Sequence, residues 1–215
     1  MRAVTERPEL PAQPAVDDDF VDQLLDIEEG PRFEAKRLVG DKLTRALESV
    51  VAFANTEGGL LVLGMEDAEK AAGRDRVYGI DEKPTNLDEL RRLIQTRITP
   101  AIQPPGFALI GCTLRDGKVG SIAYIQVHKS AGVHSIVADG TFVRMEKSNR
   151  ELVAEEITEL AMARGQISAE TLPANVAFEL LNTDYWRTYA TKRKLTRELP
   201  SAMEHLGLAK CSGSA

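Results

Sequence analysis

The sequence predicts an α/β domain of the α+β kind, in which a mixed β-sheet is flanked by helices and followed by a helical tail. Three observations lead there. Several segments carry apolar residues at helical spacing, short alternating or wholly apolar runs typical of strands lie between them, and Asp-Gly dipeptides typical of tight hairpins occur twice. We expect a flexible arm at residues 1–15, the α/β domain at 16–165 and a helical appendage at 166–215.

The first half of the domain is predicted to alternate helices and strands. Residues 17–28 fit a short helix with acids in its first turn, and 41–57 fit a longer one that Gly58-Gly59 ends. Arg32–Leu38 alternates as a strand does, so that Glu34 and Lys36 share one face while Phe33 and Ala35 share the other. The apolar run Leu60–Leu63 suits a central strand covered on both sides.

The second half is predicted to hold a helix, two hairpins and a further helix. The helix covers 86–99 and ends before Pro100, and the hairpins turn at Asp116-Gly117 and Asp139-Gly140. The second hairpin would pair His134–Ala138 with Thr141–Arg144. Ser148–Glu151 reads as a capping box that opens a helix to about residue 164, and 166–173 reads as a linker.

Composition and charge exclude several classes of function. The net charge of -6 argues against a protein that binds nucleic acid through bulk positive charge, so such a site must be a local basic surface. Cys112 and Cys211 have no metal spacing, the histidines have no zinc spacing, and no phosphate-binding loop with Gly-Lys-Ser/Thr occurs, so we expect no zinc and no nucleotide. The apolar runs are too short for a membrane span, and two cysteines without a secretory signal favour the cytoplasm.

Three acids near the predicted strands form the candidate catalytic site. Glu29 precedes the first strand, Glu34 lies on it beside Lys36, and Asp67 follows the second, where functional side chains often collect. Carboxylates beside a lysine can hold a divalent metal and stabilise charge on a phosphate. Scattered solvated acids are the competing interpretation, and the site requires that the three meet in space.

Ordered motifs resemble the Schlafen-type, Alba-like (AlbA_2) nucleic-acid-binding domain over about residues 22–155. They are Glu29-(x)4-Glu34-x-Lys36, Ala52-Phe-Ala-Asn-Thr-x-Gly-Gly59, Gly64-x-x-Asp67, Tyr78-Gly-Ile80 and Gly140-Thr-Phe-Val-Arg144. Where the family often has Gly then Ser or Thr soon after that arginine, this chain has Glu146 and Lys147.

The resemblance implies a Schlafen/Alba-like core and two possible functions. Vertebrate Schlafens cut structured RNA such as tRNA with three carboxylates and a divalent metal. Glu29, Glu34 and Asp67 would then bind Mg²⁺ or Mn²⁺, while Lys36 would stabilise the transition state. Many bacterial relatives are known only as DNA-binding modules, so a regulatory or recruitment role is the alternative. A pure oligomerisation domain is a third reading.

Local cations and the tail supply the remaining expectations. Lys36, Arg37, Arg144, Lys147 and Arg150 are the candidate nucleic-acid contacts, with Arg91 and Arg92 as weaker ones. A single lobe and an apolar tail favour a homodimer or a larger assembly through that tail, with packing on the parent core as the other outcome. The apolar tail residues are Val176, Phe178, Leu180, Leu181, Tyr185, Trp186 and Tyr189.

Overall fold

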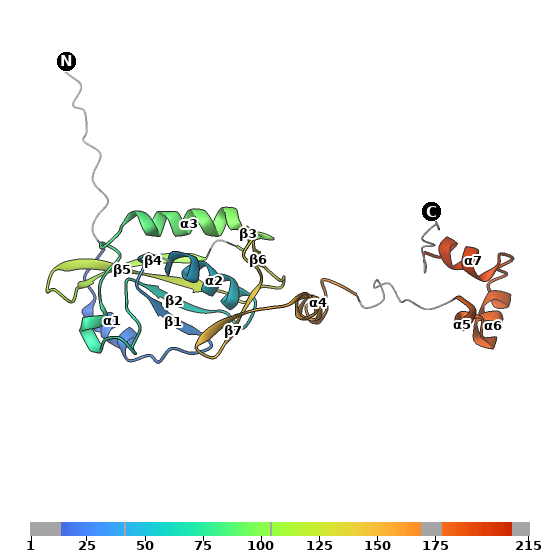
Figure 1. The fold of residues 1–215 in the computed structure, drawn as a ribbon, viewed down its shortest axis with the longest axis horizontal. Coiled ribbons are helices and arrows are strands. Elements are labelled where there is room, and N and C mark those ends of the chain that lie inside the picture. Colours follow the sequence, from blue (N-terminus) through green and yellow to red (C-terminus); the bar gives the residue numbers. More distant parts are fainter. Residues whose placement is uncertain (1–13, 41, 104, 169–177, 208–215) are drawn as a thin grey trace, which may run out of the picture. The chain divides into compact units, whose positions relative to one another are not determined.

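The computed structural model describes residues 14–40, 42–103, 105–168 and 178–207, and divides the chain into two compact units, 1–167 and 168–215 (Figure 1). Most of the predicted arm (1–13), most of the predicted linker (169–173) and Val176 lie outside the described residues.

The first unit is built on a four-stranded mixed sheet with the strand order β1-β2-β5-β4. Strand β1 runs parallel to β2 and pairs Glu34 with Leu61, whereas β2–β5 and β4–β5 are antiparallel. The expectation that Arg32–Leu38 and Leu60–Leu63 share one sheet is confirmed, and so is the hairpin around Asp116-Gly117. The strands are β1 (Phe33–Lys36), β2 (Gly59–Leu63), β4 (Gly106–Thr113) and β5 (Val119–Val127).

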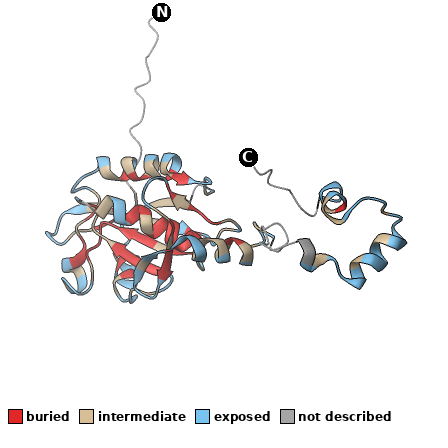
Figure 2. Cartoon of the chain, turned by 45° about the vertical axis from the view of Figure 1, so that its right-hand side comes forward, coloured by how far each residue is buried: buried red, intermediate tan, exposed pale blue. Residues whose placement is uncertain are grey.

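Helices cover both faces of this sheet because its central strands are apolar on both sides (Figure 1). Helices α2 (Lys42–Ala54) and α3 (Thr85–Arg97) pack on the face that carries Leu61 and Leu63. Helix α1 (Asp18–Leu25) packs on the opposite face, which carries Val62. Figure 2 shows the buried residues concentrated in the sheet and in the helix faces next to it.

The predicted second hairpin is wrong in its pairing. Strand β6 (Ser135–Ile136) pairs with β3 (Ile98–Thr99), and only one bridge, Ile136 to Gly140, crosses the Asp139-Gly140 turn. Strand β7 (Phe142–Met145) instead forms a hairpin with β8 (Ser148–Glu151). The segment before the turn pairs with β3, which is distant in sequence, and a local turn motif cannot predict such a pairing.

The predicted capping box at Ser148–Glu151 is therefore wrong as well, because these residues form β8. Helix α4 (Ala154–Ala163) begins several residues later, where the Glu156 carboxylate accepts a 3.1 Å hydrogen bond from the Val153 backbone N–H. A short 3₁₀ helix, η1 (Gly73–Arg76), completes the first unit.

The second unit consists of short helices with little buried apolar surface. They are α5 (Phe178–Leu181), α6 (Asp184–Lys192) and α7 (Leu199–His205). The Thr183 side chain caps α6, whereas Leu180 and Tyr185 are 72% and 90% exposed. Within the described part of both units, no helix is long and apolar enough to cross a membrane.

Candidate functional site

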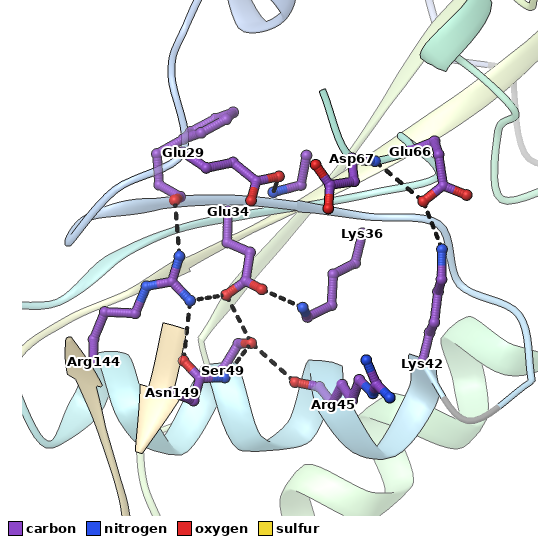
Figure 3. Close-up of polar contacts among 12 residues, drawn as sticks. Glu29, Glu34, Lys36, Lys42, Arg45, Ser49, Glu66, Asp67, Arg144 and Asn149 are labelled. Carbon is purple, nitrogen blue, oxygen red and sulfur yellow. Dashed lines mark hydrogen bonds and ion pairs between the residues drawn. The ribbon is translucent and has the colours of Figure 1, made fainter. Parts of the chain in front are cut away.

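Strand β1 directs its polar residues toward helix α2. Its Phe33 and Ala35 side chains pack in the core beside α1, and strand alternation therefore turns Glu34 and Lys36 to the other face. Figure 3 shows the Glu34 side chain pointing from β1 toward α2, with Lys36 beside it. Glu34 is buried, with only 4% of its surface exposed. The predicted shared face of Glu34 and Lys36 is confirmed.

Both oxygens of the Glu34 carboxylate accept hydrogen bonds from protein partners. Its Oε1 atom accepts a hydrogen bond from Lys36 Nζ, and its Oε2 atom accepts hydrogen bonds from Arg144 Nη1 and from the Ser49 hydroxyl (2.9 Å for the last). Asn149 donates in turn to Ser49 Oγ at 2.9 Å. A buried carboxylate needs such compensation because its desolvation is costly.

Arg144 is a buried counter-ion, which departs from the exposed phosphate contact that the sequence suggested. It is 5% exposed, and its guanidinium also donates to the backbone carbonyls of Gly30 (3.1 Å) and Phe33 (3.4 Å). Arg144 thus ties the β7–β8 hairpin to the outer edge of β1. Its donors are engaged inside the protein, so it is not a free cation for nucleic acid.

Glu29 and Asp67 lie along the outer side of β1, away from the Glu34 side chain (Figure 3). The Glu29 Oε1 atom accepts a 3.4 Å hydrogen bond from the Ala35 backbone N–H at this sheet edge. Burial, and then the negative charge of Asp67, raise the pKa of Glu29. A cation bound here would relieve the part of this effect that comes from repulsion between the two carboxylates.

The predicted metal ligands fit a divalent cation only in part. Carboxylate oxygens are the ligands that Mg²⁺ and Mn²⁺ prefer, and Glu29 and Asp67 supply two of them. Both oxygens of Glu34 are occupied by cations and Ser49. Among the residues that the structure describes, no group of three His, Cys, Asp or Glu side chains is placed to hold a metal ion. The three-carboxylate metal set remains a prediction that requires Glu34 to exchange its partners.

A cluster of cations surrounds Glu66 at the C-terminal end of β2, and sequence reasoning missed most of it. Lys42 Nζ lies 2.6 Å from the Glu66 carboxylate, Lys70 Nζ 3.7 Å and the Arg37 guanidinium 3.8 Å. Burial opposes the ionisation of Glu66, but the hydrogen bond from Lys42 and the neighbouring charges hold its pKa below the usual value. No pattern in the sequence announces the cluster, because its members come from a strand end, a helix start and a loop.

The remaining candidate nucleic-acid contacts differ in whether their side chains form ion pairs within the protein. Arg37 makes two hydrogen bonds to the Glu82 carboxylate, and Arg150 donates to both oxygens of Glu156 at 2.9 Å. Lys147, at the turn between β7 and β8, is exposed and has no ion-pair partner among the described residues. Arg91 and Arg92 pair with acids of their own helix, α3.

Asn55 has a structural role that reaches beyond the last turn of its helix, where the sequence placed it. Its side-chain amide donates to the backbone carbonyls of His134 (2.7 Å) and Phe142 (2.9 Å) and accepts from the His134 N–H (2.8 Å). His134 is buried in the same network. The Ala-Phe-Ala-Asn-Thr motif therefore fastens the end of α2 to β7, which carries Arg144, and to the residue before β6.

Comparison with known proteins gives the family. Residues 29–153 match the Schlafen, AlbA_2 family, and because this match covers more than half of the chain, the chain belongs to that family. The matched range holds the buried Glu34–Arg144 pair, the two edge carboxylates and the Glu66 cluster. No curated protein matches the chain.

Two solved structures are similar to this chain at low identity. The DIP2311 protein from Corynebacterium diphtheriae is 20% identical with a TM-score of 0.47, over 75% of this chain and 35% of that one. The N-terminal domain of an ATP-dependent DNA helicase RecG-related protein from Nitrosomonas europaea is 24% identical with a TM-score of 0.40, over 61% of this chain and 92% of that one. The chain thus corresponds to about a third of the length of the Corynebacterium protein.

Proposed function

We propose that this chain binds nucleic acid, and that the phosphate backbone is held at the cation cluster around Glu66. The observation that carries the proposal is the local excess of positive charge in an acidic protein. Three cations, Arg37, Lys42 and Lys70, lie within 4 Å of Glu66. Arg37 also pairs with Glu82, so three cations share two carboxylates, while the chain as a whole carries a net charge of -6. Membership of the AlbA_2 family, named for a nucleic-acid-binding fold, supports the same function.

Lys70 gives the sharpest test of binding. Its side chain is 60% exposed, so its removal should leave the fold unchanged. We expect Lys70→Ala to weaken binding of labelled tRNA, single-stranded DNA or duplex DNA and to lower the salt slope by about one unit, measured by fluorescence anisotropy.

Lys129→Ala is the matched control for Lys70→Ala. Lys129 is 53% exposed and also pairs with one glutamate, but it follows β5 near the N-terminal end of β2. Equal losses in the two variants would contradict a localised site. No binding of any of the three nucleic acids by the unmodified chain would reject the function.

We propose metal-dependent cleavage of RNA as a second candidate function, and the proximity of Glu29 and Asp67 favours it. Glu29 and Asp67 would hold the metal, and Lys36, if released from Glu34, would neutralise charge on the scissile phosphate. A bound Mg²⁺ or Mn²⁺ supplies an activated water and a Lewis acid. Structured RNA such as tRNA is the proposed substrate.

Cleavage is tested by incubating the chain and labelled tRNA with Mn²⁺ or with EDTA. We expect Mn²⁺-dependent cleavage that Asp67→Asn and Glu29→Gln abolish while binding is retained. Asp88→Asn on α3, whose side chain is 79% exposed, is the control for loss of a surface carboxylate. Binding without cleavage would reject the nuclease and favour the alternative, a DNA-binding regulatory or recruitment module.

Self-association and cytoplasmic location remain part of the proposal. The exposed Leu180 and Tyr185 of the second unit support a tail-mediated homodimer. Light scattering at micromolar concentration, on the full chain and on residues 1–167, is the measurement. A monomeric full chain would reject the dimer, and an unchanged dimer after truncation would move the interface to the first unit.

A further inference from the structure

Tyr78 holds two arginines at the end of the sheet that carries the cation cluster. The guanidinium carbon of Arg37 lies 3.8 Å from the centre of the Tyr78 ring, and that of Arg115 lies 4.5 Å from it. An arginine over an aromatic face is attracted by the ring and keeps its N–H donors at the rim. The ring therefore fixes the position of both guanidinium groups.

Backbone contacts hold Tyr78 in this place. Its N–H donates to Gly64 O at 2.9 Å just beyond β2, and the Arg115 N–H donates to Val77 O at 2.8 Å. Gly64 has a φ of +94°, and a Cβ there would lie 2.7 Å from the backbone of Gly79. The glycines thus allow the Tyr78 segment to lie directly against the end of β2.

The two arginines differ in what they can still bind. Arg37 donates to Glu82 and lies near Glu66, so its charge is largely satisfied. Arg115 is exposed at the turn between β4 and β5, and within the described ranges its guanidinium has no carboxylate or hydrogen-bond acceptor as a partner. Arg115 is thus a positioned guanidinium with its donors free.

We propose that Arg115, fixed by Tyr78, is a phosphate-binding residue that extends the nucleic-acid site from the Glu66 cluster to the β4–β5 turn. This inference rests on the proposed nucleic-acid binding. The planar fork of a guanidinium matches two oxygens of a phosphodiester, and stacking on the ring lowers the entropy lost on binding. Arg37 links the two parts, since it contacts both Tyr78 and Glu66.

The test compares four variants in the anisotropy assay with labelled tRNA and duplex DNA. We expect Arg115→Ala to weaken binding about tenfold at moderate salt and to lower the salt slope by about one. Arg115→Lys should keep the slope but lose part of the affinity, because the charge remains and the fork does not. Tyr78→Leu should weaken binding without changing the slope, since it removes no charge.

Arg32→Ala is the matched control. Arg32 is 71% exposed and has one carboxylate partner, at 3.7 Å. It lies immediately before β1, whereas Arg37 lies immediately after that strand. An Arg115→Ala variant that binds like the unmodified chain, or that loses no more than Arg32→Ala, would overturn the inference while the proposed function stands. Absence of binding by the unmodified chain would overturn both. Circular dichroism of each variant verifies that the fold is retained.

Discussion

Two clusters of charge, one around Glu34 on β1 and one around Glu66 beyond the C-terminal end of β2, differ in solvent access. Around Glu34 the partners Ser49 and Arg144 are buried and Lys36 is 16% exposed, and the donors of Arg144 are directed at protein acceptors. Around Glu66 the cations Lys42 and Lys70 are 22% and 60% exposed and outnumber the carboxylate. The contrast shows that a charged residue of a family motif can serve to stabilise the fold when it is buried. A surface lysine that belongs to no motif can be available to a ligand.

The largest effect should come from breaking the buried pair. Arg144→Ala leaves Glu34 buried without its main counter-ion, and we expect a loss of about 3–5 kcal/mol in the free energy of unfolding, measured by urea denaturation. The double variant Glu34→Gln/Arg144→Met should recover much of this loss, because it removes both fully buried charges and leaves only Lys36, whose side chain is 16% exposed, without a carboxylate. A single variant as stable as the unmodified chain would show that the pair is not buried in solution.

Removing the central carboxylate of the second cluster should reduce the free energy of unfolding by less. Glu66→Gln removes a carboxylate whose partners still reach water, and we expect a loss of about 1–3 kcal/mol at pH 7. The pKa of Glu66 is lower in the folded protein than its ordinary value of 4.5. The ionised carboxylate therefore stabilises the folded state above pH 4.5, and this stabilisation is lost as the pH falls through the pKa of the folded state.

The free energy of unfolding of Glu66→Gln and of the unmodified chain is measured as a function of pH. Because the variant lacks the titrating carboxylate, it should lose less stability below about pH 4.5 than the unmodified chain. Equal acid dependence of the two proteins would contradict the assignment.

Glu29 should respond to pH in the opposite direction. Its pKa is raised on folding, so ionisation costs the native state stability as the pH rises above the ordinary value of 4.5. We expect Glu29→Gln, which keeps an acceptor for the Ala35 N–H, to raise stability at pH 7 by up to about 1 kcal/mol. Thermal unfolding at pH 4 and pH 7 measures this. A gain at pH 4 equal to that at pH 7 would show that electrostatics is not the cause.

The smallest effect on stability is expected at Lys147. This exposed residue at the β7–β8 turn has no ion-pair partner within the described residues, so Lys147→Glu should change stability by less than about 0.5 kcal/mol. If the hairpin contributes to binding, affinity for nucleic acid should fall and the salt slope with it. Unchanged affinity would confine the proposed nucleic-acid site to the Glu66 cluster and the arginines on Tyr78.

The sequence alone determined the core elements of the fold and the face that each polar residue of β1 occupies. Strand alternation placed Glu34 with Lys36, the apolar run at Leu60–Leu63 predicted a doubly covered strand, and Asp116-Gly117 predicted a hairpin that the structure contains. These predictions succeed because periodicity and turn chemistry are local properties of the chain.

Only the tertiary structure decided which charges are buried and which are free. Arg144 lies 110 positions from Glu34 in sequence, and the partners of Glu66 come from separate elements, so neither spacing nor composition could assign them. The failed prediction around Asp139-Gly140 has the same origin, since β6 pairs with the distant β3. Burial and long-range pairing depend on how elements pack, and packing sets both the desolvation of a charge and the partner that compensates it.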